Sequence, residues 1–105
     1  MITVDNSNFE KEVLQSKIPV MIKFTASWCR PCHAIQPILE EVAKELEGKA
    51  TIVKLDIDDS SDVAAKFKVK SIPTMIVFKN GEAVKTQIGS IPKDKIIALF
   101  ELENK

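Results

Sequence analysis

The most reactive side chains of this chain lie together in one heptapeptide, SWCRPCH, at positions 27–33. It contains the only two cysteines, the only tryptophan and the only histidine among the 105 residues. Two thiols separated by two residues can form a redox-active dithiol, whereas the same spacing followed by histidine is the attachment motif of a c-type haem. The residues around the cysteines must distinguish these two kinds of chemistry.

The surroundings favour the dithiol. A haem would need an axial ligand and, usually, export, yet the N-terminal sequence MITVDNSNFEKEV lacks a basic region followed by an apolar stretch. A structural zinc site would need four ligands, and the adjacent side chains of Cys32 and His33 diverge on a helix. Two ordinary buried cysteines would leave Trp28 and Pro31 unexplained. We therefore predict neither a metal nor a cofactor.

Cys29 is the predicted nucleophile and Cys32 the predicted resolving thiol. The pair is expected where a helix begins, so the first thiol meets unsatisfied backbone N–H groups at the positive end of the helix dipole, which lower its pKa. One turn later, Cys32 can attack the mixed disulfide that Cys29 forms with a substrate. Pro31 suits the first turn because its missing N–H costs nothing there.

Length and composition describe one soluble domain over residues 1–105. With 45% hydrophobic residues and only three glycines, the chain can bury an ordinary core without a disulfide staple. Fifteen basic residues balance fifteen acidic ones, so neither nucleic acid nor a membrane is an expected partner. No run of 18 apolar residues occurs, and we expect a cytoplasmic monomer.

Periodicity predicts an α/β fold in which strands and helices alternate before a final hairpin. Such an order implies a central mixed sheet with helices on both faces, and active groups at the carboxyl ends of its strands, where SWCRPCH falls. Asn80 and Gly81 predict a type I′ turn in the hairpin. The order βαβαβαββα comes from strands at 2–4, 19–26, 50–58, 74–79 and 82–89, and from helices that begin near residues 7, 31, 60 and 92.

Local signals predict where the helices begin and end. Ser7 and Glu10 have the spacing of a capping box for the first helix, and Ser60 or Ser61 is the expected cap of the third. Gly48 is placed to end the second helix, and Pro37 inside that helix should kink it.

Taken together, these motifs resemble the thioredoxin family over essentially the whole chain. The resemblance implies the thioredoxin fold, with a central mixed five-stranded sheet flanked by four helices. The segment SIPT at 71–74 is similar to the family's loop with a cis proline that faces the dithiol. The matching positions are Trp28, Cys29, Pro31 and Cys32 in the signature WCxPC, Pro37 as the kinking proline, Lys54 near the active site, Ile72 and Pro73 in the loop, FKNGE at 78–82 as the hairpin, and Gly89 in the substrate groove.

The resemblance also implies an activity. The chain would be a protein-disulfide reductase that receives its electrons from an NADPH-dependent thioredoxin reductase. A cis bond before Pro73 would expose the backbone of Ile72 to an extended substrate peptide. Trp28 and Gly89 would complete the apolar substrate contact, although a purely structural packing role for Trp28 is an alternative.

We assign redox tuning to four residues, of which Pro31 and Lys54 follow the family pattern and Arg30 and Lys23 depart from it. Arg30 stands where relatives carry glycine. A cation beside Cys29 favours the thiolate and makes the couple more oxidising, by about 30 mV for one pKa unit. If Arg30 instead points into water, screening reduces this effect.

Lys23 is the larger departure, because the family places a buried acid beneath the second cysteine. A buried neutral amine could accept the proton of Cys32, and a charged one would stabilise its thiolate directly. The alternative is that Lys23 extends to the surface and plays no part. His33 is expected on the exposed side of the helix.

Two other functions compete with the reductase. The same fold could act as a thiol oxidase or isomerase, which Arg30 and Lys23 favour, or as a non-catalytic binding subunit. Equilibration with glutathione separates the first alternative from the reductase, and cysteine variants test the second.

Overall fold

The computed structural model describes residues 1–102 and has the predicted order of elements. The strands are β1 (Ile2–Val4), β2 (Val20–Thr25), β3 (Thr51–Asp56), β4 (Thr74–Lys79) and β5 (Glu82–Ile88), and the helices are η1 (Glu10–Leu14), α1 (Arg30–Glu45), α2 (Ser61–Lys66) and α3 (Lys93–Leu99). Within the described residues, the strands form a mixed five-stranded sheet in the order β1-β3-β2-β4-β5. The predicted fold class is therefore confirmed.

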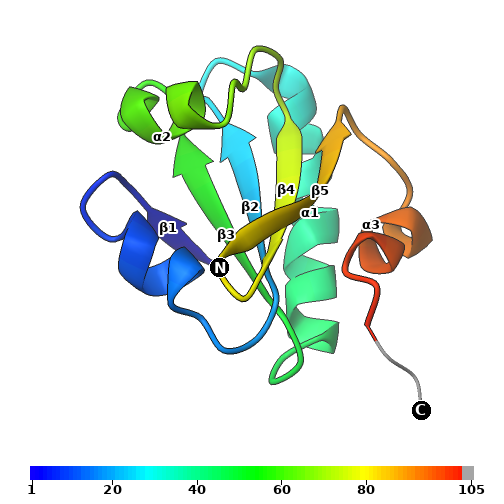
Figure 1. The fold of residues 1–105 in the computed structure, drawn as a ribbon. Helices are drawn as coiled ribbons and strands as arrows, with labels where there is room; N and C mark the ends of the chain where they lie inside the picture. The colour runs from blue at the N-terminus through cyan, green and yellow to red at the C-terminus, as the bar shows by residue number, and fades with distance from the viewer. Residues whose placement is uncertain (103–105) are drawn as a thin grey trace.

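Strand direction divides the sheet into two parts. β1 and β2 each pair with β3 in parallel, whereas β4 is antiparallel to both β2 and β5. The parallel connections run through helices, and the antiparallel pair β4 and β5 is joined directly as a hairpin (Figure 1). Because β2 is central, its carboxyl end is surrounded by other elements.

Helices cover both faces of the sheet. Figure 1 shows η1 and α2 on one side of the strands and α1 and α3 on the other. Successive side chains of a strand point to opposite faces, so each strand supplies both cores. The first core contains Phe9, Val13, Val20, Ile22, Phe24, Val53, Leu55, Val63, Ala64, Ile76 and Phe78. The second contains Met21, Ile35, Leu39, Val42, Ile52, Met75, Val77, Ile96 and Phe100.

The alternation along β2 decides where its one charged residue lies. Val20, Ile22 and Phe24 belong to the core under η1 and α2, whereas Met21 belongs to the core under α1. Lys23 follows Met21 by two positions and therefore points to the α1 face as well. The sheet thus places a lysine in the interior beneath α1.

The predicted helix caps differ from the structure in detail. Ser7 does not cap η1; instead the Asp5 carboxylate accepts the backbone N–H groups of Ser7 and Asn8, and the helix begins only at Glu10. Asx turns of this kind compete with helix formation. Ser60 is the N-cap residue of α2, as predicted, but its hydroxyl accepts the N–H of Asn6 and makes no capping bond to the helix.

The second helix ends before the predicted glycine. α1 ends at Glu45 with Leu46 as its C-cap, and Gly48 lies in the following turn with φ of +87°. The helix continues through Pro37, and the expected kink there stays a prediction. The final helix stops at Leu99, and the part of its predicted range at Glu103 lies outside the described residues.

Within residues 1–102, no helix is both long and apolar enough to cross a membrane.

The hairpin turn agrees with the sequence. Asn80 and Gly81 have φ angles of +54° and +82°, as a type I′ turn requires. A Cβ on Gly81 would lie 3.1 Å from the carbonyl oxygen of Leu14, at the end of η1. This turn therefore combines a left-handed backbone with a close approach to another element.

Replacing Gly81 with alanine should destabilise the protein more than replacing Gly48. Both positions have a left-handed φ, which costs about 1–2 kcal/mol for a residue with a Cβ. At Gly48 the added Cβ meets nothing within 4 Å, so Gly48→Ala isolates the backbone cost. Urea unfolding of the two variants measures the difference in free energy of unfolding. Equal losses would show that the turn does not depend on its contact with Leu14.

Candidate active site

The dithiol lies between the carboxyl end of β2 and the first turn of α1. Ala26 begins the connection, and its carbonyl accepts the backbone N–H of Cys29. Cys29 is the N-cap of α1, and Arg30 and Pro31 form the first helical positions. The expected start of the helix at the cysteine pair is what the structure shows.

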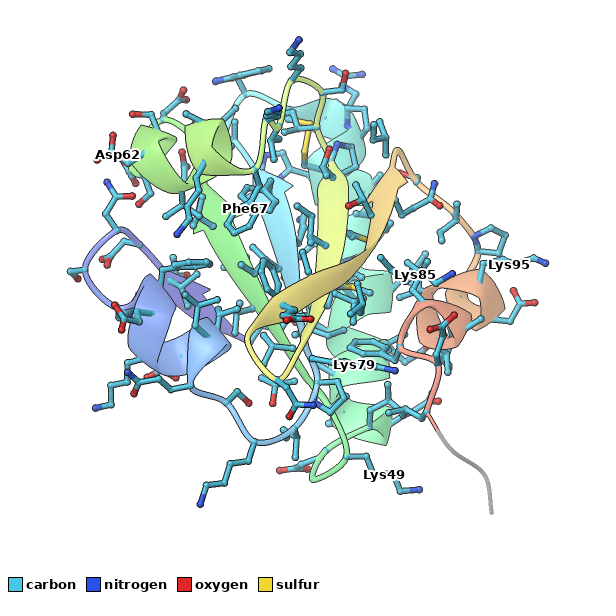
Figure 2. All side chains as sticks on the ribbon, viewed as in Figure 1. Lys49, Asp62, Phe67, Lys79, Lys85 and Lys95 are labelled. Atoms are coloured by element: carbon cyan, nitrogen blue, oxygen red, sulfur yellow. A yellow bond between two sulfur atoms is a disulfide. The ribbon has the colours of Figure 1, made fainter. Side chains whose placement is uncertain are left out.

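Cys29 and Cys32 are joined in a disulfide, so the structure represents the oxidised protein (Figure 2). The Cys29 sulfur accepts the backbone N–H of Cys32 at 3.2 Å, which places it at the positive end of α1. An acceptor at this position stabilises the helix as an N-cap side chain does. The same N–H would stabilise a thiolate at Cys29 after reduction.

The two sulfurs differ in their access to solvent. The disulfide packs among apolar side chains, including Ala26 and the half-buried Ile57 and Ile72. Cys29 keeps 4% of its surface exposed, whereas Cys32 has none. What exposure remains is therefore on the Cys29 side of the disulfide, which favours Cys29 as the residue that an external thiolate or disulfide meets.

The loop before β4 lies against the disulfide. The peptide bond between Ile72 and Pro73 is cis, as the resemblance implies. Ile72 contacts the disulfide cluster, and the carbonyl of Pro73 accepts the N–H of Gly89 at 2.8 Å. The structure thus brings together three of the four predicted substrate residues, and their role in binding stays a prediction.

Trp28, the fourth predicted substrate-binding residue, lies at the surface. Its side chain is 66% exposed, which excludes packing in the core as its main role. The indole N–H donates to the Asp58 carboxylate at 2.8 Å, just past the end of β3. Sequence reasoning missed Asp58. The available signal was that Asp58 follows β3, which runs parallel to β2, so the two strands end at the same edge of the sheet.

Lys23 is buried beneath Cys32, with only 2% of its surface exposed. Its amine donates to the Cys32 carbonyl at 2.8 Å and to the Gln36 side-chain oxygen at 2.5 Å. The alternative in which this lysine extends to the surface is wrong. Burial lowers the pKa of Lys23 to about 8, helped by the charge of Lys54 and opposed by that of Glu40.

A cavity of about 250 Å³ opens beside Lys23 on the α1 face. Lys54 lies opposite Lys23 in the pairing of β2 with β3, so the two predicted tuning lysines share this space. Thr25 also borders it. The full lining is Thr3, Lys23, Thr25, Ala26, Ser27, His33, Gln36, Lys54, Asp56 and Asp59.

The remaining predicted residues have exposed side chains at the start of α1. Arg30 and Pro31 are exposed on its first turn. His33 is also exposed, as expected, and its Nε2–H donates to the Ser27 carbonyl at 2.7 Å. Gln36, which sequence reasoning missed, lies on the inner side one turn after Cys32; its spacing of four residues from the cysteine was the only signal.

Comparison with known proteins agrees with this geometry. The thioredoxin family model matches residues 1–101. Thioredoxin C-2 of Corynebacterium nephridii is 40% identical over 101 residues, which cover 96% of this chain and 94% of that protein. Thioredoxin of Haemophilus influenzae is 43% identical over 91% of this chain and 90% of its own length, and thioredoxin 1 of Nostoc sp. is 39% identical over 93% and 92%.

A match over almost the whole chain, a mixed sheet of the expected topology and a disulfide at the first turn of α1 lead to one conclusion. The chain belongs to the thioredoxin family of thiol-disulfide oxidoreductases.

Proposed function

We propose that this protein reduces protein disulfides with Cys29 as the attacking thiol and Cys32 as the resolving thiol. The observation that carries this division of roles is the position of the two residues: Cys29 caps α1 and keeps 4% of its surface exposed, whereas Cys32 has none. The attacking sulfur must meet a large substrate, whereas the resolving sulfur needs to reach only its neighbour.

The exchange proceeds in two steps that balance. The Cys29 thiolate attacks one sulfur of the substrate disulfide, which forms a mixed disulfide and releases the first substrate thiolate. The Cys32 thiolate then attacks the Cys29 sulfur, which breaks the mixed disulfide and releases the second substrate thiolate. Two electrons have moved to the substrate, and the protein is left with the disulfide seen here.

The substrate surface in this proposal surrounds Cys29. Trp28 presents an exposed indole on one side, and Ile72 and Pro73 border the disulfide on the other. Gly89 lies next to this loop, because its backbone N–H donates to the Pro73 carbonyl. Backbone pairing with an extended peptide would give affinity without strong selection for side chains.

The oxidised protein must be returned to the dithiol by a reductase partner. We propose that this partner is an NADPH-dependent thioredoxin reductase and that the cycle takes place in the cytoplasm. The support for this reductase partner is the match to the thioredoxin family over residues 1–101 and the shared positions Pro31 and Lys54, from which Arg30 and Lys23 depart. Reduction of the oxidised chain by purified reductase and NADPH, followed as NADPH oxidation, tests the partner.

A second candidate is a more oxidising member of the same fold, an oxidase or isomerase. The observation that favours it is the buried amine of Lys23 against Cys32, because a cation there stabilises the reduced, ionised form. Equilibration with glutathione buffers separates the two directions of electron flow.

Serine variants of the two cysteines should behave differently in an insulin-reduction assay. Cys29→Ser removes the attacking sulfur and should abolish both turnover and mixed-disulfide formation. Cys32→Ser should also stop turnover, but it should accumulate a mixed disulfide through Cys29 that non-reducing electrophoresis detects. Each variant serves as the control of the other. Retained turnover in either variant would contradict the mechanism, whereas a native protein without insulin-reducing turnover would leave only a binding role.

Arg30→Gly should make the protein slightly more reducing. The guanidinium is exposed, so water and salt screen its effect on the Cys29 thiolate, and we expect a change of less than tenfold in the equilibrium constant with glutathione. That limit corresponds to about 30 mV for a two-electron couple. Arg30→Lys keeps the charge and should leave the constant unchanged. A shift of equal size in both variants would exclude charge as the cause.

A further inference from the structure

A groove of about 470 Å³ lies between the last strand and the last helix, and it shares no residue with the cavity beside Lys23. We call it the β5–α3 groove. Lys85 and Gln87 are two positions apart on β5, so they point to the same face of the sheet. The lining consists of Lys85, Gln87, Ile91, Pro92, Lys95, Ala98 and Leu99.

Strand pairing and helix spacing explain why these residues meet. Lys85 and Gln87 pair with Val77 and Met75 of β4, whose side chains belong to the core on the α1 and α3 side of the sheet. On α3, the lining positions 95, 98 and 99 have the spacing of one helix face. The groove therefore separates one face of β5 from one face of α3.

The floor of the groove is apolar. Ile91 and Leu99 are partly buried and pack against the core beneath α1. Pro92 and Ala98, beside them, are exposed. An apolar side chain placed in the groove would thus lie against aliphatic groups that already belong to the core surface.

The charged residues of the lining are both lysines. The lining contains no acidic residue, although the whole chain has fifteen acidic and fifteen basic residues. On α3, Lys93 is paired with Glu41 and Glu45 of α1, whereas Lys95 forms no ion pair within residues 1–102. A carboxylate that enters the groove would meet positive charge on both walls.

Lys85 already binds a carboxylate of the chain itself. Its amine lies 3.1 Å from the Glu101 carboxylate, and the two side chains are 45% and 53% exposed. Water can replace either partner of so open a pair, so another carboxylate can take the place of Glu101. An edge strand can also carry lysine to prevent pairing with a second strand, but this reason does not apply to Lys95, which is on a helix.

The groove continues the substrate surface around the disulfide. Ile72 contacts the disulfide cluster, and the Pro73 carbonyl accepts the N–H of Gly89 at 2.8 Å. Ile91 follows two residues after Gly89, a distance of at most about 7 Å along the chain. A peptide that passes Ile72 and Gly89 therefore needs only a few more residues to enter the groove.

We propose that the β5–α3 groove binds an acidic and apolar segment of the disulfide substrate, adjacent in sequence to the cysteine that reacts with Cys29. This inference rests on the proposed reductase function and names a substrate class for it. Apolar side chains of the segment lie on Ile91 and Leu99, and its carboxylates pair with Lys85 and Lys95.

A second groove in the described residues has the opposite charge. It lies along the surface of α1 and is lined by Met1, Pro37, Glu40, Glu41, Ala43, Lys44 and Glu47. Three glutamates against one lysine repel an acidic segment. Because the net charge of the chain is zero, a preference for acidic substrates requires a local site such as the β5–α3 groove.

The test compares three peptides that differ only in charge. Each has one cysteine disulfide-bonded to glutathione and a six-residue extension of alternating leucine with glutamate, glutamine or lysine, which reaches about 20 Å when extended. Extensions are made on either side of the cysteine. Reduced protein converts each mixed disulfide to two thiols and becomes oxidised, and the second-order rate constant is measured at 20 mM and 500 mM salt.

The native protein should reduce the glutamate peptide about tenfold faster than the glutamine peptide at low salt, in one of the two orientations. Each exposed ion pair contributes a factor of about two to five, and two lysines are available. At 500 mM salt the ratio should fall toward one. The lysine peptide should be the slowest. Equal rate constants for all three peptides in both orientations would overturn the inference.

Charge variants locate the effect in the groove. The double variant Lys85→Gln with Lys95→Gln should lose the preference, whereas Lys11→Gln, which removes the same charge from η1 on the other side of the sheet, should keep it. Lys95→Glu should shift the preference toward the lysine peptide, a change of sign that damage to the fold would not produce. A preference that survives in the double variant would place the acidic segment elsewhere.

Ala98→Glu tests the alternative that a second copy of this chain occupies the groove. Residue 98 is exposed on α3, and a glutamate there should repel the acidic peptide while the protein sediments as the native one does. A native dimer that Ala98→Glu converts to a monomer would assign the groove to self-association and overturn the proposal. Native protein that reduces none of the peptides would instead fail the proposed function itself.

Discussion

The helix α1 begins directly after the central strand β2, and the active site depends on that junction. The backbone N–H groups of the first turn of α1 have no partner within the helix, and the Cys29 sulfur accepts the one that belongs to Cys32. A single contact thus caps the helix, positions the attacking sulfur and holds the two cysteines close together. The central position of β2 places this turn among the carboxyl ends of parallel strands, where the loop of Ile72 and the indole of Trp28 can reach it.

Most of the fold could be predicted because its signals are local and repeated. Strand alternation, the Asn80–Gly81 turn and the helical spacing after Pro31 each act over a few residues, and all point to the same topology. The caps were less predictable, because several polar residues compete for the same N–H groups. Asp5 takes those near η1 in place of Ser7, and Ser60 bonds to Asn6, which is distant in sequence.

The residues of the active site likewise fall into those that local sequence signals reveal and those that only long-range contacts reveal. The cysteine pair and Pro31 are contiguous, so their spacing in the sequence already indicates their chemistry. Lys23 reaches the site only through the register of β2 under α1, and two outcomes were open until its burial was known. Gln36 and Asp58 were missed because nothing in a glutamine or an aspartate indicates its partner when that partner, Lys23 or Trp28, lies 13 or 30 residues away.

The unequal access of the two sulfurs has a consequence for how the protein shares its partners. Only the Cys29 side of the disulfide keeps any solvent exposure, so an electron donor and an electron acceptor must bind at the same surface. They cannot occupy it together. The reductase and the disulfide substrate therefore compete for one binding surface, and each must dissociate before the other binds. An abundant oxidised substrate then slows reduction of the protein, as a shortage of reductase does.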